Sequence, residues 1–364
     1  MKKKTGKRIL LGVGVGLAVF LIAVLIGGSV LFGRFVRAAN SVEKLEDGLY
    51  AMEFAGEYGF EEFLARGGAK SDREVADYLI SFLSHGLYKE SGGEPAEGFG
   101  CSTVFTQDES GASFFGRNYD WAQCRAMIVH TKPLKGYESI STCCLDFLGF
   151  GDDFTPDGSM MERMQSIAAI YVPLDGMNSE GLMVADLTVG DSEETHQQTG
   201  KTSLTTTTAI RLLLDRAANV EEAIDLLKGI DMNSSIGISH HLSIADASGR
   251  SVVVEYVNGE MLVADTRVVT NHYLAESEKQ GMGSEQSHRR YAALSAAQSP
   301  AGAEEVRDLL ESVAQKNIPQ AEYEKTMWSI VYRPGEKRAD FYFAENFGHS
   351  YRLSLADEAG FWSR

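Results

Sequence analysis

The sequence predicts a layered α+β domain that is preceded by one transmembrane helix. Runs of β-prone residues alternate with stretches whose apolar residues recur at helical spacing. Strands and helices that are interleaved in this way usually pack as sheets covered by helices. A separate apolar run at residues 9–33 is long enough to cross a bilayer. The chain of 364 residues is therefore expected to hold one large core and an N-terminal appendage.

The apolar run contains no charged residue over twenty-five positions, from 9 to 33. Five basic residues precede it within the tail 1–8, and only two follow it closely. The positive-inside rule then places the N-terminus in the cytoplasm and the rest of the chain outside. A cleavable signal peptide usually has a shorter apolar stretch that ends at a small-x-small site. The sequence RAAN at 37–40 could serve as such a site, so a cleaved signal peptide and a secreted protein remain the alternative. We predict a signal anchor over 9–33.

Residues 34–100 are predicted to form a helical pro-segment and a linker. Apolar residues recur at helical spacing over 41–66 and over 71–88, with Gly67 and Gly68 between the two helices. Ser71 and Glu74 form a capping box at the start of the second helix. The Gly-rich sequence SGGEPAEGFG then gives a flexible approach to residue 101. A second domain follows over 101–364.

This second domain opens with a predicted β-hairpin. The β-prone runs CSTVFTQ and ASFFGRN flank the turn-rich sequence DESG. The returning strand brings Arg117 and Asp120 beside Cys101, which they follow by sixteen and nineteen residues. A guanidinium near a thiol favours the thiolate, and a carboxylate can fix the guanidinium and hold an α-ammonium group. The hairpin therefore predicts a reactive cysteine.

The remaining pattern alternates helices and strands. Helices are predicted at 204–218, 219–229 and 303–315, and Asn219 is a good N-cap for the second of them. Strands are predicted as a ladder of hairpins at 240–265 and as three closing strands at 327–334, 338–346 and 350–356.

Composition excludes several function classes. The net charge of −17 argues against a nucleic-acid partner and against docking on anionic lipid. The four cysteines are too few and too unevenly spaced for a disulfide framework or a zinc site, and the histidines lack ligand partners at metal spacing. We expect no metal and no cofactor. The sequence leaves open whether Cys124 pairs with Cys143 or Cys144.

Residues 98–121, GFGCSTVFTQDESGASFFGRNYDW, resemble the start of the catalytic chain of the linear amide C–N hydrolases. This branch of the N-terminal-nucleophile hydrolases includes choloylglycine (bile salt) hydrolases, penicillin V acylases and acid ceramidase. The resemblance implies a four-layer αββα sandwich and a precursor that cleaves itself between Gly100 and Cys101. The freed α-amine, with a pKa near ~7.7–8.0, would accept the thiol proton and return it to a leaving amine.

Further blocks follow in the order of that family. DGMNSEGLMVADLTV resembles its Asn-x-x-Gly-Leu block, with Thr188 where relatives carry an oxyanion donor that is commonly Asn or Tyr. VVTNHY resembles the Thr-Asn segment of the second oxyanion group, and SEQSHRRYAAL resembles the block that carries an arginine, here Arg290 or, in another register, Arg289. The resemblance thus implies catalytic roles for Cys101, Arg117, Asp120, Asn271 and Arg290, and an oxyanion or pocket role for Thr188 and Asn178.

These residues predict an extracytoplasmic, membrane-anchored hydrolase that cleaves linear amides of small N-acyl substrates through a cysteine thioester. Acyl transfer to an amine shares that thioester and is the enzymatic alternative. A silent membrane-tethered binding protein is the alternative from another class, but it has no reason to keep Cys101, Arg117 and Asp120 at these offsets. N-acyl amino acids, bile-salt conjugates, penicillin-like amides and lipid amides all remain candidate substrates. The Phe- and Met-rich loop at 145–165 is a candidate pocket for the acyl group. The sequence leaves the oligomeric state open.

Overall fold

Two large β-sheets organise the chain, for which the computed structural model describes residues 33–84, 100–121, 124–150, 153–189, 193–297, 302–316, 325–357 and 360–363. The nine-stranded sheet has the order β1 (Glu43–Glu46), β2 (Leu49–Ala55), β5 (Ala126–Lys132), β6 (Ser139–Cys144), β7 (Asp175–Asn178), β8 (Met183–Thr188), β11 (His240–Ala245), β12 (Ser251–Val257) and β13 (Glu260–Asp265). The seven-stranded sheet has the order β14 (Val268–Val269), β3 (Gly100–Gln107), β4 (Ser113–Trp121), β15 (Lys325–Arg333), β16 (Arg338–Phe343), β17 (Tyr351–Ser354) and β18 (Trp362–Ser363).

The remaining elements are helices and one small sheet. The helices are α2 (Phe60–Ala65), α3 (Asp72–Ser84), α4 (Met160–Ser166), α5 (Thr206–Arg216), α6 (Val220–Lys228), α7 (Glu285–Ala296) and α8 (Ala303–Val313). Short 3₁₀ helices lie at η1 (Leu145–Leu148), η2 (Ile167–Tyr171) and η3 (Pro334–Glu336), and β9 (Thr202–Thr205) pairs in parallel with β10 (Ile230–Asn233). Helices α5, α6 and α8, the strands β11 to β13 and the closing strands β15 to β17 lie where the sequence predicts them.

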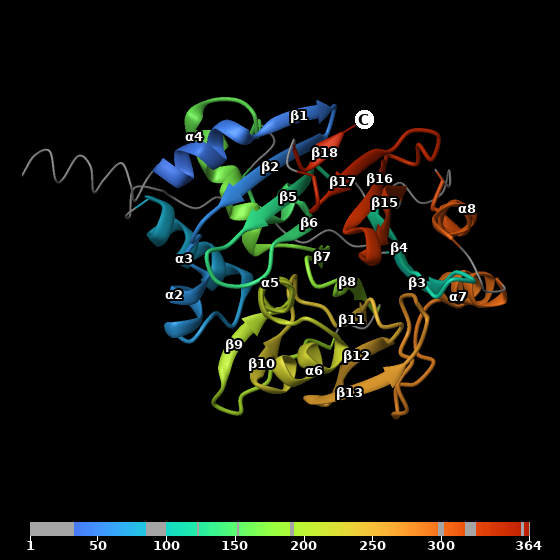
Figure 1. Cartoon of the computed structure of the whole chain (residues 1–364). Coiled ribbons are helices and arrows are strands. Elements are labelled where there is room, and N and C mark those ends of the chain that lie inside the picture. Colours follow the sequence, from blue (N-terminus) through green and yellow to red (C-terminus); the bar gives the residue numbers. More distant parts are fainter. Residues whose placement is uncertain are drawn as a thin grey trace, which may run out of the picture.

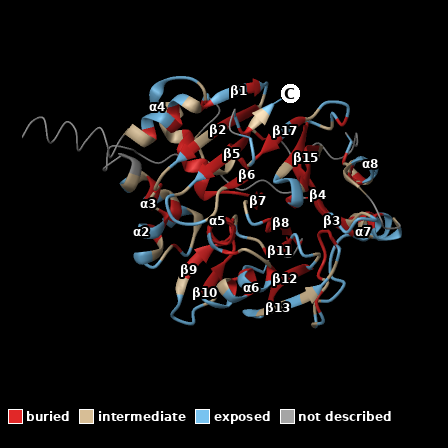
Figure 2. Cartoon of the chain, in the orientation of Figure 1, coloured by how far each residue is buried: buried red, intermediate tan, exposed pale blue. Residues whose placement is uncertain are grey.

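The layers follow the order helix, sheet, sheet, helix (Figure 1). Side chains from both sheets meet in one core, which includes Phe115, Ile128 and Trp328. A second core lies between the nine-stranded sheet and helices α2, α3, α5 and α6, and a third lies between the seven-stranded sheet and helices α7 and α8. Figure 2 shows the buried strands at the centre and the exposed faces of the outer helices. The predicted α+β class is confirmed.

The predicted hairpin is formed by β3 and β4. Its register pairs Cys101 with Tyr119 and Thr103 with Arg117. Because side chains alternate along a strand, Cys101 and Tyr119 both point into the space between the two sheets. Arg117 shares that face, two residues along the strand from Tyr119, and so lies diagonal to Cys101.

The N-terminal segment differs from the predicted pair of helices. Residues 43–55 form the antiparallel strands β1 and β2, and β2 pairs in parallel with β5 over seven residues. Both faces of β2 are covered, because Met52 and Phe54 pack towards the helices and Leu49 and Ala51 pack between the sheets. A strand that is buried on both faces loses the apolar–polar alternation that identifies strands in a sequence. Among the described residues of the two predicted ranges, α2 and α3 are helical, and residue 41 belongs to a helical stretch at 33–41.

Two further expectations concern the N-terminus and the cysteines. Most of the predicted membrane run, residues 9–32, and the linker at 85–99 lie outside the described residues. Within the described ranges no helix is both long and apolar enough to span a bilayer. A disulfide joins Cys124 to Cys144, and Cys143 is buried as a free thiol, which decides the pairing that the sequence left open.

Candidate active site

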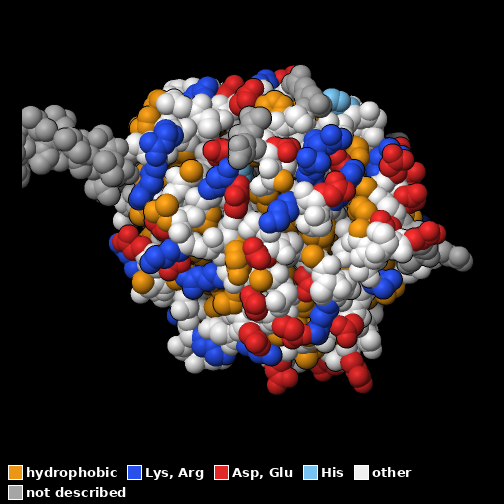
Figure 3. Space-filling model, viewed as in Figure 1, with side chains coloured by type: hydrophobic (Ala, Val, Ile, Leu, Met, Phe, Trp, Pro, Cys, Tyr) orange, Lys and Arg blue, Asp and Glu red, His pale blue; other side chains and the backbone are white. Residues whose placement is uncertain are grey.

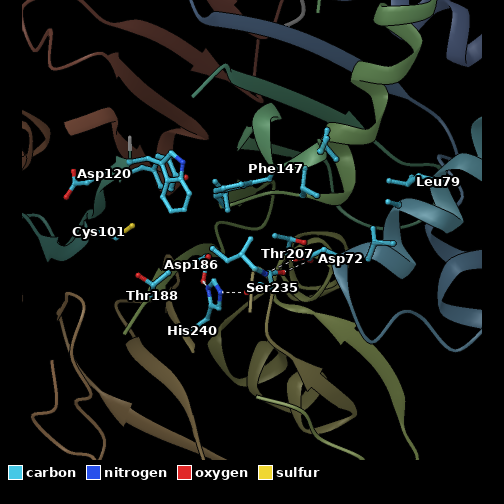
Figure 4. A pocket seen from close by; sticks show the side chains of 18 residues that line it. Asp72, Leu79, Cys101, Asp120, Phe147, Asp186, Thr188, Thr207, Ser235 and His240 are labelled. Atoms are coloured by element: carbon cyan, nitrogen blue, oxygen red, sulfur yellow. Dashed lines mark hydrogen bonds and ion pairs between the residues drawn. The ribbon is translucent and has the colours of Figure 1, made fainter. Parts of the chain in front are cut away.

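A cavity of about 760 Å³, including open solvent at its mouth, contains Cys101 in its wall (Figure 4). Residues of β3, β4, β8, β11, η1, α3 and α5 line it. Most of the wall is apolar and includes Tyr119, Trp121 and Phe147. The ring centroids of Trp121 and Phe147 are 4.9 Å apart, and the two rings pack edge to face. An enclosed apolar cavity with a few polar groups is the usual form of a small-molecule site.

Cys101 is only 4% exposed, and all three of its polar positions have partners. Its Sγ lies 3.7 Å from Nη2 of Arg117, and its N–H donates to Oδ1 of Asn271 at 2.7 Å. Its carbonyl oxygen accepts from Nη1 of Arg290 at 2.6 Å. Burial raises the pKa of the Cys101 thiol to about 11 although the Arg117 charge opposes this shift. In the uncut chain the thiol is therefore protonated at neutral pH, and the guanidinium alone does not produce the thiolate that the sequence suggested.

Arg117 takes its anionic partner from β7 and not from its own hairpin. Its guanidinium forms a buried ion pair with Asp175 and donates to the carbonyl oxygens of Leu174 at 3.0 Å and Asp186 at 2.7 Å. Asp175 also accepts from Nε1 of Trp328 at 3.1 Å and from the hydroxyl of Tyr332 at 2.6 Å. The expectation that Asp120 fixes Arg117 is wrong, because successive side chains along β4 point to opposite faces of the sheet and these two residues are three positions apart.

Asp120 lies instead on the face covered by α7. Its carboxylate is 3.5 Å from Nη1 of Arg290 and accepts from the Thr326 hydroxyl at 2.6 Å. A Cβ atom at Gly100 would come within 2.8 Å of the same carboxylate. A side chain at that position would displace Asp120, so the residue before Cys101 is best glycine.

Asn271 and Arg290 complete the surroundings of the cysteine backbone. Nη2 of Arg290 donates to Oδ1 of Asn271 at 2.6 Å, so this oxygen accepts from both Arg290 and Cys101. Nδ2 of Asn271 donates to the Thr188 carbonyl at 2.7 Å and lies 3.4 Å from the Thr188 hydroxyl. Arg289 is exposed, which decides the register in favour of Arg290.

Asn178 does not belong to this site. It is the last residue of β7 and is fully buried, and its side-chain amide donates to the carbonyl oxygens of Leu214 and Ala217. Its Oδ1 accepts from the backbone of Glu180 and Leu182. With both ends of the side chain engaged by the backbone, its role is to shape the turn, and the pocket role that the sequence suggested is corrected.

Sequence reasoning missed a charged pair in the cavity wall. Nδ1 of His240 lies 2.8 Å from Oδ1 of Asp186, and its Nε2 lies 2.8 Å from the carbonyl oxygen of Ser235. A carboxylate and a carbonyl oxygen both accept hydrogen bonds, so this geometry suits the imidazolium form, in which both ring nitrogens donate. Burial opposes this charge, but Asp186 raises the pKa of His240 above its ordinary value. No spacing in the sequence joins these two residues, because they meet only through the pairing of β8 with β11.

Comparison with known proteins assigns the family. Residues 165–347, half of the chain, match the family model described as acyl-coenzyme A:6-aminopenicillanic acid acyl-transferase. The chain belongs to this family. No curated protein matches the chain in sequence. The predicted kinship with the linear amide C–N hydrolases is confirmed.

Solved structures of two enzymes resemble this member of the acyl-transferase family, and those of a conjugated bile acid hydrolase show the same fold. A mutant of conjugated bile acid hydrolase from Clostridium perfringens is 17% identical, with 70% of this chain and 92% of that chain covered at a TM-score of 0.51. A second variant of that enzyme gives the same values. Penicillin V acylase from Agrobacterium tumefaciens is 17% identical, with 71% and 87% covered at a TM-score of 0.49. The family match begins after the β3–β4 hairpin, so the roles of Cys101, Arg117 and Asp120 stay predictions.

Proposed function

We propose that the chain is a cysteine N-terminal-nucleophile amidohydrolase that cleaves linear N-acyl amides. The observation that carries this proposal is the position of Cys101, whose sulfur is in the wall of an apolar cavity and whose nitrogen is held by Asn271. Once the bond after Gly100 is cut, that nitrogen becomes an α-amine next to its own thiol. Asn271 and Asp120 would then hold and balance the ammonium form, while Arg117 stabilises the sulfur anion.

The proposed reaction has two steps through one thioester. The α-amine takes the thiol proton, the sulfur attacks the amide carbonyl carbon, and the C–N bond breaks as the α-ammonium protonates the leaving amine. Water then enters, the α-amine takes one of its protons, and the resulting hydroxide adds to the thioester carbon. The C–S bond breaks, the acid leaves, and the thiol is restored.

The oxyanion formed in each step needs hydrogen-bond donors. The Thr188 hydroxyl is well placed for this, because its oxygen faces Nδ2 of Asn271 and its own proton remains to be donated. The second N–H of Asn271 would turn from its long contact with Thr188 to the substrate oxygen. Thr188 would thereby replace the Asn or Tyr that relatives carry.

Replacing Asn271 with alanine is expected to lower turnover on the order of 10²-fold and to affect chain cleavage less. Asn271→Asp is the matched variant, because it keeps an acceptor for Arg290 and for the Cys101 nitrogen but has no N–H. Initial rates and intact mass over time measure the two effects. Near-normal turnover in Asn271→Asp would contradict the donor role, since that result would mean that only the acceptor matters.

The mature catalytic chain is expected to start at Cys101 and to stay bound to the N-terminal piece. No cysteine precedes Cys101, so no disulfide can join the two pieces. The pairing of β2 with β5 and the burial of several large side chains, at roughly 1.5–3 kcal/mol each, favour retention. We propose that residues 9–33 anchor this complex in the membrane with the catalytic domain outside. Membranes washed with mild denaturant but no reductant should release a chain whose N-terminal sequence begins at Cys101, whereas an active uncut chain would contradict self-cleavage.

Acyl transfer to an amine is the second candidate, favoured by the acyl-transferase description of the family. It differs only in whether water or an amine attacks the thioester. Mass spectrometry of the protein after exposure to a panel of N-acyl amides should find the acyl group on the peptide that begins with Cys101. Products formed with and without an added amine then separate the two reactions: free acid alone supports hydrolysis, and a new amide supports transfer. No acyl adduct with any amide would contradict both.

A further inference from the structure

The end of the cavity opposite Cys101 is formed by helix α3, which precedes the proposed cut. Asp72, Val75, Ala76 and Leu79 of this helix line the cavity, and they recur at the spacing of one helix face. In Figure 4, Cys101 and Asp120 lie at one end of the cavity and Leu79 and Asp72 lie at the other. We propose that α3 sets the length of the acyl chain that the enzyme accepts, an inference that rests on the proposed amide hydrolysis.

Helix α3 is fixed against the catalytic chain by direct contacts. The Asp72 carboxylate accepts from the Ser235 hydroxyl at 2.9 Å and from the backbone N–H of Ile236 at 2.7 Å. Ser235 and Ile236 also line the cavity, so the two pieces meet at its wall. On the other side, the Tyr78 hydroxyl donates to the carbonyl oxygen of Gly59 at 2.7 Å. The helix is thus held in place by both pieces and forms a preorganised wall.

The chemistry of the thioester decides which half of the substrate occupies the cavity. The acyl group remains bonded to the Cys101 sulfur while the amine departs and water takes its place. We therefore place the acyl group in this cavity, because it stays bonded to the Cys101 sulfur in the cavity wall after the amine has left. The wall of this cavity includes Phe147, Leu148, Val172 and Leu174, which favour an apolar chain. Figure 4 shows the polar residues Asp186, His240, Ser235 and Thr207 on the other side, between Cys101 and Asp72, so the chain would pack against the apolar side.

Ala76 is the position where a larger side chain would shorten this cavity. It lies on the lining face of α3 and is half-buried, and its neighbour Asp77 is exposed and absent from the lining. A bulky residue at 76 would exclude the end of a long acyl chain. Each methylene kept out of the cavity costs about fourfold in kcat/KM. A residue of the same size at 77 would leave the cavity unchanged.

The test compares Ala76→Phe with Asp77→Phe on a series of acyl p-nitroanilides from acetyl to dodecanoyl. Ala76→Phe is expected to lower the ratio of dodecanoyl to butanoyl kcat/KM at least tenfold, and Asp77→Phe is expected to leave it within about twofold of the wild type. Leu79→Ala should shift the preferred length upward. Ala76→Leu repeats the test with a smaller side chain if the phenylalanine variant does not fold, and intact mass verifies that each variant is cut.

The outcomes separate this inference from the proposed function. If the wild type hydrolyses the series but Ala76→Phe or Ala76→Leu has the same length profile as Asp77→Phe, α3 does not set the chain length and amide hydrolysis stands. If the wild type cleaves no member and forms no thioester, the proposed function fails and the inference falls with it. A length profile that changes at 76 and not at 77 supports both.

Discussion

Replacing Cys101 with alanine is expected to abolish both cleavage of the chain and hydrolysis of amides. The same sulfur is proposed to attack the carbonyl of Gly100 during maturation and the substrate carbonyl during turnover, so neither step has a nucleophile in the variant. The loss of turnover should be on the order of 10⁴-fold or more, as is typical for removal of a covalent nucleophile. Intact mass of the purified chain and release of the amine product measure the two effects.

Two further variants make this experiment specific to Cys101. Cys101→Ser should be cut slowly and hydrolyse poorly, because a hydroxyl ionises far less readily than a thiol. Cys143 is also buried and free, so Cys143→Ala is the matched control and should keep both activities. Wild-type turnover in a folded Cys101→Ala protein would exclude this residue as the nucleophile.

The elements of the candidate site that depend on local sequence could be predicted. The β3–β4 hairpin has its turn, its strands and its register within twenty-two residues, from Gly100 to Trp121. Strand alternation then fixes which side chains share a face with Cys101. The same rule would have placed Asp120 on the opposite face from Arg117, since the two are three residues apart on one strand.

The partners that arrive from distant parts of the chain could not be predicted. Asp175 reaches Arg117 only because β7 lies in the facing sheet, and α3 reaches the cavity only because β2 is paired with β5. These contacts depend on how the layers stack, which no short window of sequence contains. A signal for Asp175 did exist, because a carboxylate within the apolar sequence YVPLDGM is rarely buried without a partner.

The position of the buried face of helix α7 could also have decided between Arg289 and Arg290 from the sequence. The N-cap Ser284 sets the start of α7, and the buried residues Ser287, Arg290 and Leu294 then follow at helical spacing. Leu294 lies four residues after Arg290, so the apolar face already includes position 290. Position 289 is outside this face and is exposed.

The buried Arg117–Asp175 pair is expected to produce the largest stability effect in the site. Arg117→Met leaves the Asp175 carboxylate without its cation at a fully buried position, and such a loss typically destabilises a protein by about 3–5 kcal/mol. It also removes the charge that faces the Cys101 sulfur, so hydrolysis should fall as well. The shift of the urea midpoint measures stability, best in the Cys101→Ala background in which the chain stays in one piece.

The double variant separates the structural role of the pair from its chemical role. Asp175→Asn removes the carboxylate charge but keeps an oxygen that can accept from Trp328 or Tyr332. Arg117→Met with Asp175→Asn therefore leaves no unpaired buried charge, and it should be more stable than the sum of the single variants predicts, by roughly 1–3 kcal/mol. Hydrolysis, measured with Cys101 present, should remain as low as in Arg117→Met, because the sulfur still has no guanidinium beside it. If activity returned together with stability, Arg117 would serve only to hold the two sheets in place and the proposed stabilisation of the sulfur anion would be wrong.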